Sequence, residues 1–99
     1  MAYEIEFTAD AHGDFRGLDA SLRAWVRNAL EVHLRHEPTK ISKSRIKRLR
    51  ELRQPQYRLR VEDCRVCYDV EDEVVTILGI VMKAASYGWL DDNPTKEDD

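Results

Sequence analysis

The sequence predicts an α+β fold, with two helices packed on one face of a small, mainly antiparallel β-sheet. Three observations lead to this prediction. Residues 57–82 contain three strand-like runs joined by short acidic turns, residues 2–8 alternate apolar and polar side chains, and residues 19–36 repeat apolar side chains every three or four positions. The expected order is one strand, two helices, a basic loop, three strands and a short C-terminal helix.

The N-terminal elements follow from local signals. Tyr3, Ile5 and Phe7 alternate with polar residues, as in a strand with one buried face. A short helix is expected over 10–16, ending at Gly17. A longer helix is expected from a cap at Asp19 through about residue 36, before Pro38. Its predicted buried stripe consists of Leu22, Trp25, Val26, Ala29, Val32 and His33.

The three runs of residues 57–82 predict an antiparallel meander. In the first two, the apolar side chains fall on alternate positions, namely Tyr57, Leu59, Val61, Val66, Tyr68 and Val70. The pairs 62–63 and 71–72 are short enough for hairpin turns. The third run, 74–82, is almost wholly apolar, as expected of a central strand covered on both faces. The polar face of the meander carries Arg58, Arg60 and Arg65 together, and the missing side chain of Gly79 predicts a hollow on that face.

Charge is distributed unevenly along the chain. The formal net charge of the 99 residues is -3, but residues 40–60 hold nine of the sixteen lysines and arginines. A local positive field of this kind favours a polyanionic partner. We interpret 39–54 as a long basic loop with a turn or two of helix. Residues 1–90 are expected to form one domain, and 91–99 an acidic, frayed tail with five acids against Lys96.

The compartment expected from the sequence is the cytoplasm. No apolar run approaches the ~18–20 residues that span a bilayer, and Glu4 and Glu6 interrupt the N-terminus where a signal peptide would be apolar. We therefore expect no membrane partner.

The pattern resembles the RelE/ParE superfamily of bacterial toxins from type II toxin–antitoxin systems. The resemblance covers about residues 2–90 and is carried by the opening Tyr3–Phe7 alternation, the Arg48-Leu49 pair, the signature over 57–68, and the apolar strand that precedes Lys83. It implies a cytoplasmic toxin whose open sheet face is its working surface, and a cognate antitoxin that wraps this surface. RelE-like members cut messenger RNA on the ribosome, and operator DNA would be bound only through the antitoxin complex.

The resemblance also implies site residues for a metal-independent endoribonuclease. Arg65 lies at the position of a RelE-like arginine that contacts the scissile phosphate, and Arg60 would support it. Lys83 is the expected proton acceptor, and Tyr87 a general acid or stacking platform. The expected RNA-binding residues are Lys43, Arg45, Lys47, Arg48, Arg50 and Arg58. The sequence departs from the RelE-like pattern at Ala84, where a further arginine is usual.

Two alternative functions and one metal site have to be weighed. The chain could be a ParE-like toxin that inhibits DNA gyrase by binding, or a weakened relative that only binds its antitoxin. Cys64, Cys67, His33 and His36 are ligand types suited to zinc. However, cysteines three apart on a strand point to opposite faces, so we expect no metal, no disulfide between them and no cofactor.

Overall fold

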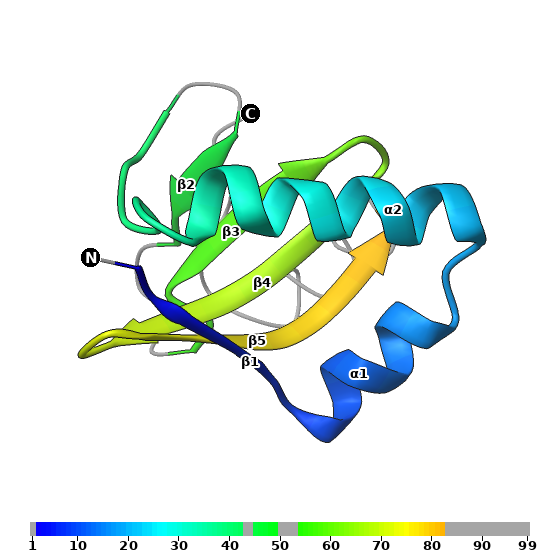
Figure 1. Ribbon diagram of the computed structural model, residues 1–99, viewed down its shortest axis with the longest axis horizontal. Coiled ribbons are helices and arrows are strands. Elements are labelled where there is room, and N and C mark those ends of the chain that lie inside the picture. The colour runs from blue at the N-terminus through cyan, green and yellow to red at the C-terminus, as the bar shows by residue number, and fades with distance from the viewer. Residues whose placement is uncertain (1, 43–44, 50–53, 83–99) are drawn as a thin grey trace.

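A computed structural model describes residues 2–42, 45–49 and 54–82 (Figure 1). Its five strands form one sheet in the order β1-β5-β4-β3-β2, in which β1 pairs parallel with β5 and every other pairing is antiparallel. The elements are β1 (Glu4–Phe7), α1 (Ala9–Arg16), α2 (Ala20–Ala29), a π-helical turn η1 (Leu30–Leu34), β2 (Ile46–Arg48), β3 (Tyr57–Val61), β4 (Cys64–Glu71) and β5 (Val74–Met82). The predicted α+β class is confirmed, whereas the expected short C-terminal helix and the acidic tail lie outside the described residues.

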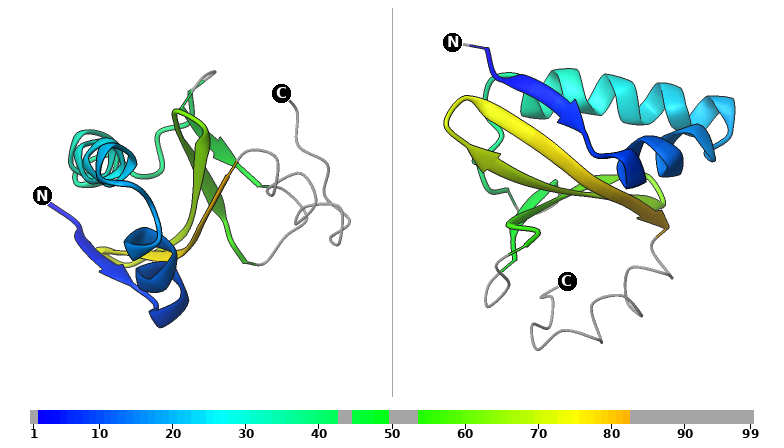
Figure 2. Two further views of the ribbon diagram at one scale, coloured as in Figure 1. Left: turned by 90° about the vertical axis from the view of Figure 1, so that its right-hand side faces the viewer. Right: turned by 90° about the horizontal axis from the view of Figure 1, so that it is seen from below.

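The core lies between the sheet and the helix formed by α2 and η1. Figure 2 shows α2 across one face of the sheet, with α1 beside the end that carries β1 and β5. Val26, Leu30 and Leu34 of the helix pack against Leu59, Val66, Tyr68 and Ile77 of the sheet. These strand residues are the alternate apolar positions of the sequence, so the predicted parity of the meander is confirmed. Tyr68 also donates a hydrogen bond of 2.6 Å to the carbonyl of buried Pro38.

The helix boundaries follow the predicted local signals. The Asp19 carboxylate accepts a hydrogen bond of 2.8 Å from the Leu22 amide and caps α2, and Gly17 ends α1. The helix then widens into η1, where the Arg35 amide donates to the Leu30 carbonyl. The last helical residue is Leu34, with Arg35 as the C-cap, so the helix ends before Pro38, as predicted.

The predicted buried stripe of this helix is wrong at two positions. Trp25 is 53% exposed and Val32 is 62% exposed, although Val26 and Ala29 are buried. The stripe that faces the sheet is centred instead on Val26, Leu30 and Leu34. Periodicity alone allowed a buried stripe that includes Trp25 and Val32. The contact with the sheet selected the neighbouring stripe, which includes Leu30 and Leu34.

The basic segment contains a strand that the sequence did not predict. Ile46–Arg48 pairs antiparallel with β3, so Ile46 lies opposite Leu59 and Lys47 opposite Arg58. Three residues without clear alternation carry too little signal to reveal a strand, and the pairing depends on the neighbour that β3 provides. The interpretation of 39–54 as a loop is therefore wrong over these residues.

The hairpins that join the meander strands are as short as predicted. Glu62 has φ 51° and Asp72 has φ 56°, so each connection begins with a residue in the left-handed region. The second turn consists of Asp72 and Glu73, one residue later than expected, because Glu71 is the last residue of β4.

In the described part of the chain, no helix is long and apolar enough to cross a membrane.

Helix α1 covers part of an edge that β1 leaves open. β1 ends at Phe7, opposite Ile77, whereas β5 continues to Met82. Beyond this point the Asp14 carboxylate accepts a hydrogen bond of 3.0 Å from the Ile80 amide, and the Thr8 hydroxyl donates to the Leu78 carbonyl at 3.3 Å. The side chains of Asp14 in α1 and of its N-cap Thr8 thus satisfy backbone groups of β5 that another strand would otherwise bind.

Candidate functional site

The sheet face turned away from α2 holds the arginines that the sequence placed together. Across the strands, Lys47 pairs with Arg58, Arg58 with Cys67, and Cys67 with Gly79. In the next row Arg60 pairs with Arg65, which lies opposite Val81. Directly paired residues project to the same face, so Arg58, Arg60 and Arg65 share it.

Two of these arginines are buried, which the sequence did not predict. Arg65 is 1% exposed and Arg58 is 4% exposed, whereas Arg60 is half-buried. The alternation of polar and apolar residues predicts an open, solvated face instead. Burial of a guanidinium group costs several kcal/mol unless a partner compensates for it. The free-energy cost of burying Arg58 and Arg65 therefore depends on the groups that their side chains contact.

The described partners of Arg65 are backbone carbonyls. Its Nη1 donates hydrogen bonds of 3.0 Å to the carbonyls of Glu62 and Cys64, whereas Nε has no hydrogen-bond partner. Within residues 2–42, 45–49 and 54–82, no carboxylate forms an ion pair with Arg65. The Asp69 carboxylate accepts instead from the Gln56 amide at 2.7 Å and from Gln54 Nε2 at 2.9 Å. The positive charge of Arg65 is not neutralised by these groups.

The predicted RNA-binding residues do not all share one surface. Lys47 lies in the same row as Arg58, on the arginine face. Arg48 is paired with Tyr57 and lies on the opposite face, where its guanidinium carbon is 5.1 Å from the centre of the Tyr57 ring. Its Nη1 also donates to the Gln56 carbonyl at 2.8 Å. Lys43, Arg50, Lys83 and Tyr87 lie outside the described residues.

Arg45 lies near the helix rather than among the other arginines. It is exposed, and its Nη1 donates to the Arg60 carbonyl at 3.4 Å. Burial and, to a smaller extent, the positive charge of Arg45 lower the pKa of His33. The structure places His12 in α1, His33 in η1 and His36 just after η1. None of these histidines lies on the arginine face.

A hollow of about 480 Å³ adjoins the arginine face at Gly79, where the sequence predicted one. Cys67, Gly79 and Val81 line it from the sheet. Asp10 and Asp14 line it from α1, and Asp14 Oδ2 is 3.6 Å from the place that a Cβ on Gly79 would take. Sequence reasoning missed both carboxylates, because no local signal shows that α1 packs beside β5.

The two cysteines do not provide a nucleophile. Burial raises the pKa of the Cys67 thiol to about 11, and burial also raises the pKa of Cys64. Both thiols are therefore protonated near neutral pH and react slowly. Among the residues that the structure describes, no three His, Cys, Asp or Glu side chains are grouped so as to hold a metal ion.

Comparison with known proteins identifies the architecture. Neither the family models nor the curated proteins include a match to the sequence. Several solved structures do match. A chain of the toxin–antitoxin complex RelBE2 from Mycobacterium tuberculosis superposes with a TM-score of 0.67 at 24% identity, over 83% of this chain and 99% of that one.

Two further structures give the same result. A chain of the archaeal RelE–RelB complex from Pyrococcus horikoshii has a TM-score of 0.69 and 23% identity, over 84% of this chain and 97% of that one. A mutant of the Escherichia coli toxin RelE in the free state has a TM-score of 0.66 and 24% identity, over 90% of this chain and 92% of its own. This chain therefore has the RelE toxin fold.

Proposed function

We propose that this protein is the toxin of a toxin–antitoxin pair and that it cuts messenger RNA on the ribosome without a metal ion. The RelE fold supports the toxin assignment, since similar chains occur in complexes with RelB antitoxins. The observation that carries the nuclease assignment is Arg65, a buried cation with a free Nε and no carboxylate partner among the described residues. A phosphate group would supply the missing negative charge.

The chemistry requires three tasks. In metal-free cleavage, the ribose 2′-hydroxyl loses its proton and attacks the adjacent phosphorus, negative charge grows on the phosphoryl oxygens, and the 5′-oxygen leaves with a proton. Arg65 suits the second task, because a planar guanidinium binds two phosphate oxygens at once. Arg60 is its direct cross-strand neighbour and would share the charge.

The row beside Arg65 suits the flanking nucleotides. Lys47 and Arg58 lie opposite each other on the same face and would bind the RNA backbone. The hollow at Gly79 is unsuited to phosphate, because Asp10 and Asp14 are part of its lining. A neutral nucleobase would avoid this repulsion, so we assign the hollow to a base. Lys83 and Tyr87 remain the proposed proton-transfer groups, on sequence alone.

Burial of Arg65 adds a condition to this proposal. With 1% of its surface exposed, the guanidinium can meet a phosphate only after the side chains that cover it move. The free protein would then have a closed site that RNA or the ribosome opens. Such a rearrangement would explain how a strongly cationic site is kept from binding nucleic acids indiscriminately.

Two assays on the purified chain test the function. Added to a translating extract, the protein should cut message, and in a gyrase supercoiling assay it should have no effect. Arg65→Ala and Lys83→Ala should each remove cleavage, with a loss comparable to the ~2.7–4 kcal/mol of an oxyanion-hole donor. Intact message with inhibited supercoiling would instead support the ParE-like alternative. Normal growth on expression of the chain would support a protein that only binds its antitoxin.

A further inference from the structure

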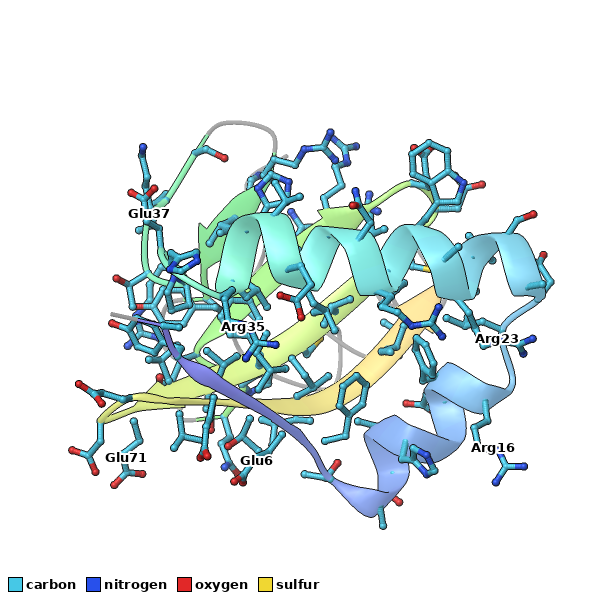
Figure 3. The ribbon with its side chains drawn as sticks, viewed as in Figure 1. Glu6, Arg16, Arg23, Arg35, Glu37 and Glu71 are labelled. Atoms are coloured by element: carbon cyan, nitrogen blue, oxygen red, sulfur yellow. The ribbon has the colours of Figure 1, made fainter. Side chains whose placement is uncertain are left out.

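Two sulfur atoms lie in contact at the end of the sheet where β5 finishes. Cys64 is the first residue of β4 and Met82 the last residue of β5, and the two residues pair directly across the strands. Directly paired side chains project to the same face, which here is the face covered by the helix. The Cys64 thiol donates a hydrogen bond to the Met82 thioether, with the sulfur atoms 3.6 Å apart. Figure 3 shows α2 passing in front of this end of β5.

The two sulfur-containing side chains differ in their access to solvent. Cys64 is fully buried in the core, whereas Met82 is 42% exposed. An ion can therefore reach the thioether from water, and the thiol through the thioether, without opening the core. Methionine has three rotatable side-chain bonds, so Met82 can adjust its position to an ion.

The charges around Cys64 favour a cation. Burial is the main cause of the raised pKa of its thiol, and the negative charge of Asp63 raises this pKa by more than the positive charge of Arg65 lowers it. Asp19 adds a further negative charge that raises the pKa. The three charged groups together thus place a negative electrostatic potential at the sulfur, and this potential stabilises a bound positive ion.

The chemistry of the sulfur pair selects the metal. Thiolate and thioether sulfur are soft ligands, which favour copper(I) over the hard ions magnesium and calcium. A structural zinc site needs four ligands, and in the described part of the chain no three His, Cys, Asp or Glu residues are grouped to supply them. Copper(I) accepts two ligands, which is the number that the pair provides.

The distance between the sulfur atoms is compatible with one shared ion. A metal–sulfur bond is about 2.3 Å long, so two sulfur atoms on opposite sides of one ion are about 4.6 Å apart. The observed 3.6 Å is shorter and corresponds to a bent arrangement. A small outward movement of the Met82 side chain gives the straight arrangement, which copper(I) prefers with two ligands.

We propose that Cys64 and Met82 together bind one copper(I) ion. The ion replaces the proton between the two sulfur atoms: the Cys64 S–H bond breaks, the proton passes to water, a copper–sulfur bond forms, and the Met82 sulfur donates a lone pair. No electron is transferred, so the ion stays copper(I). This site differs from a zinc set of two cysteines and two histidines, because it uses neither Cys67 nor a histidine. The pair lies on the opposite face from Arg65, so copper(I) binding does not depend on the proposed function.

Titration of the purified full chain with copper(I) tests the site. The ion is offered in the absence of oxygen as its coloured complex with bicinchoninate, which loses colour when the protein takes up the ion. We expect one tightly bound ion per chain, and an X-ray absorption spectrum that detects only sulfur neighbours. Because binding releases the thiol proton, the affinity should rise about tenfold for each pH unit between about 6 and 8.

Three variants identify the ligands. Cys64→Ala should abolish binding. Met82→Leu keeps an apolar side chain of similar size and should weaken binding at least about tenfold, since loss of a residue that merely supports a metal ligand already costs about 10–100-fold. Cys67→Ala is the matched control and should keep full affinity, because Cys67 is also buried but lies on the arginine face. Circular dichroism checks that each variant folds, and if Cys64→Ala does not, the partly exposed Met82 decides through Met82→Leu.

Several results would overturn the proposed site. Nitrogen neighbours in the absorption spectrum would assign the ion to histidines instead. The proposal also fails if Met82→Leu binds copper(I) as tightly as the unmodified chain, or if Cys67→Ala loses as much affinity as Met82→Leu. No uptake of copper(I) from bicinchoninate would exclude the site altogether.

Discussion

Replacement of Arg65 by methionine separates a functional arginine from a structural one. Methionine has a similar length and no charge, so the variant removes the guanidinium and leaves an apolar side chain in its place. We expect cleavage to fall by about 10²–10³, as for loss of one preorganised donor to a developing oxyanion. The unfolding free energy should change much less than this loss would suggest.

The stability estimate follows from the contacts of Arg65. Its two hydrogen bonds to carbonyls, each 3.0 Å, are charge-assisted, and each contributes about 1.5–3 kcal/mol. Burial of a guanidinium without a counter-charge costs several kcal/mol in the opposite direction. The two contributions nearly cancel, so Arg65→Met should change the unfolding free energy by less than about 2 kcal/mol in either direction.

Urea denaturation and cleavage in a translating extract, measured on the same preparations, provide the test. Arg23→Met is the matched control, because Arg23 Nη1 also donates to two backbone carbonyls, those of Arg16 and Leu18 at 3.2 and 2.6 Å, but lies on the helix side. That variant should keep full cleavage. Our reasoning would be refuted if Arg65→Met lost 3 kcal/mol or more, since breaking a buried ionic pair costs about 3–5 kcal/mol. Retained cleavage would refute it equally.

Three further predictions concern other parts of the structure. Tyr68→Phe leaves the buried Pro38 carbonyl without its donor and should cost about 1–3 kcal/mol in urea denaturation, whereas Tyr57→Phe, whose hydroxyl has no described partner, should cost less than half as much. Because the pKa of Cys67 is raised to about 11 in the folded state, the unfolded state loses its proton first, and the unfolding free energy should fall between pH 9 and about 11. Cys67→Ala should flatten this fall, and an unchanged pH profile would contradict the assignment. Asp14→Asn keeps an acceptor for the β5 amide but removes a negative charge beside the hollow, so a labelled RNA oligonucleotide should bind up to about fivefold more tightly by fluorescence anisotropy. Weaker binding would exclude our assignment of this hollow.

Local patterns were sufficient for most of the elements. Strict alternation over β3 and β4 predicted both strands and the face that each residue occupies, because a strand's side chains alternate whatever its neighbours are. The Asp19 cap and the stop at Gly17 were likewise readable, since capping depends on groups within one turn. The shared face of Arg58, Arg60 and Arg65 follows from the same alternation.

Other features depended on contacts between distant segments, and the sequence could not show them. The strand β2 exists because β3 offers it a partner, and Trp25 is exposed because the helix turned another stripe toward the sheet. The place of Asp14 beside Gly79 likewise depends on α1 covering the open edge of β5. The sequence by itself determined the described strands and helices other than β2, and the faces of the meander strands, because these depend on the geometry of a few neighbouring residues. Only the tertiary structure decided that Arg65 is buried with no carboxylate partner among the described residues, because burial is set by everything that packs around a side chain.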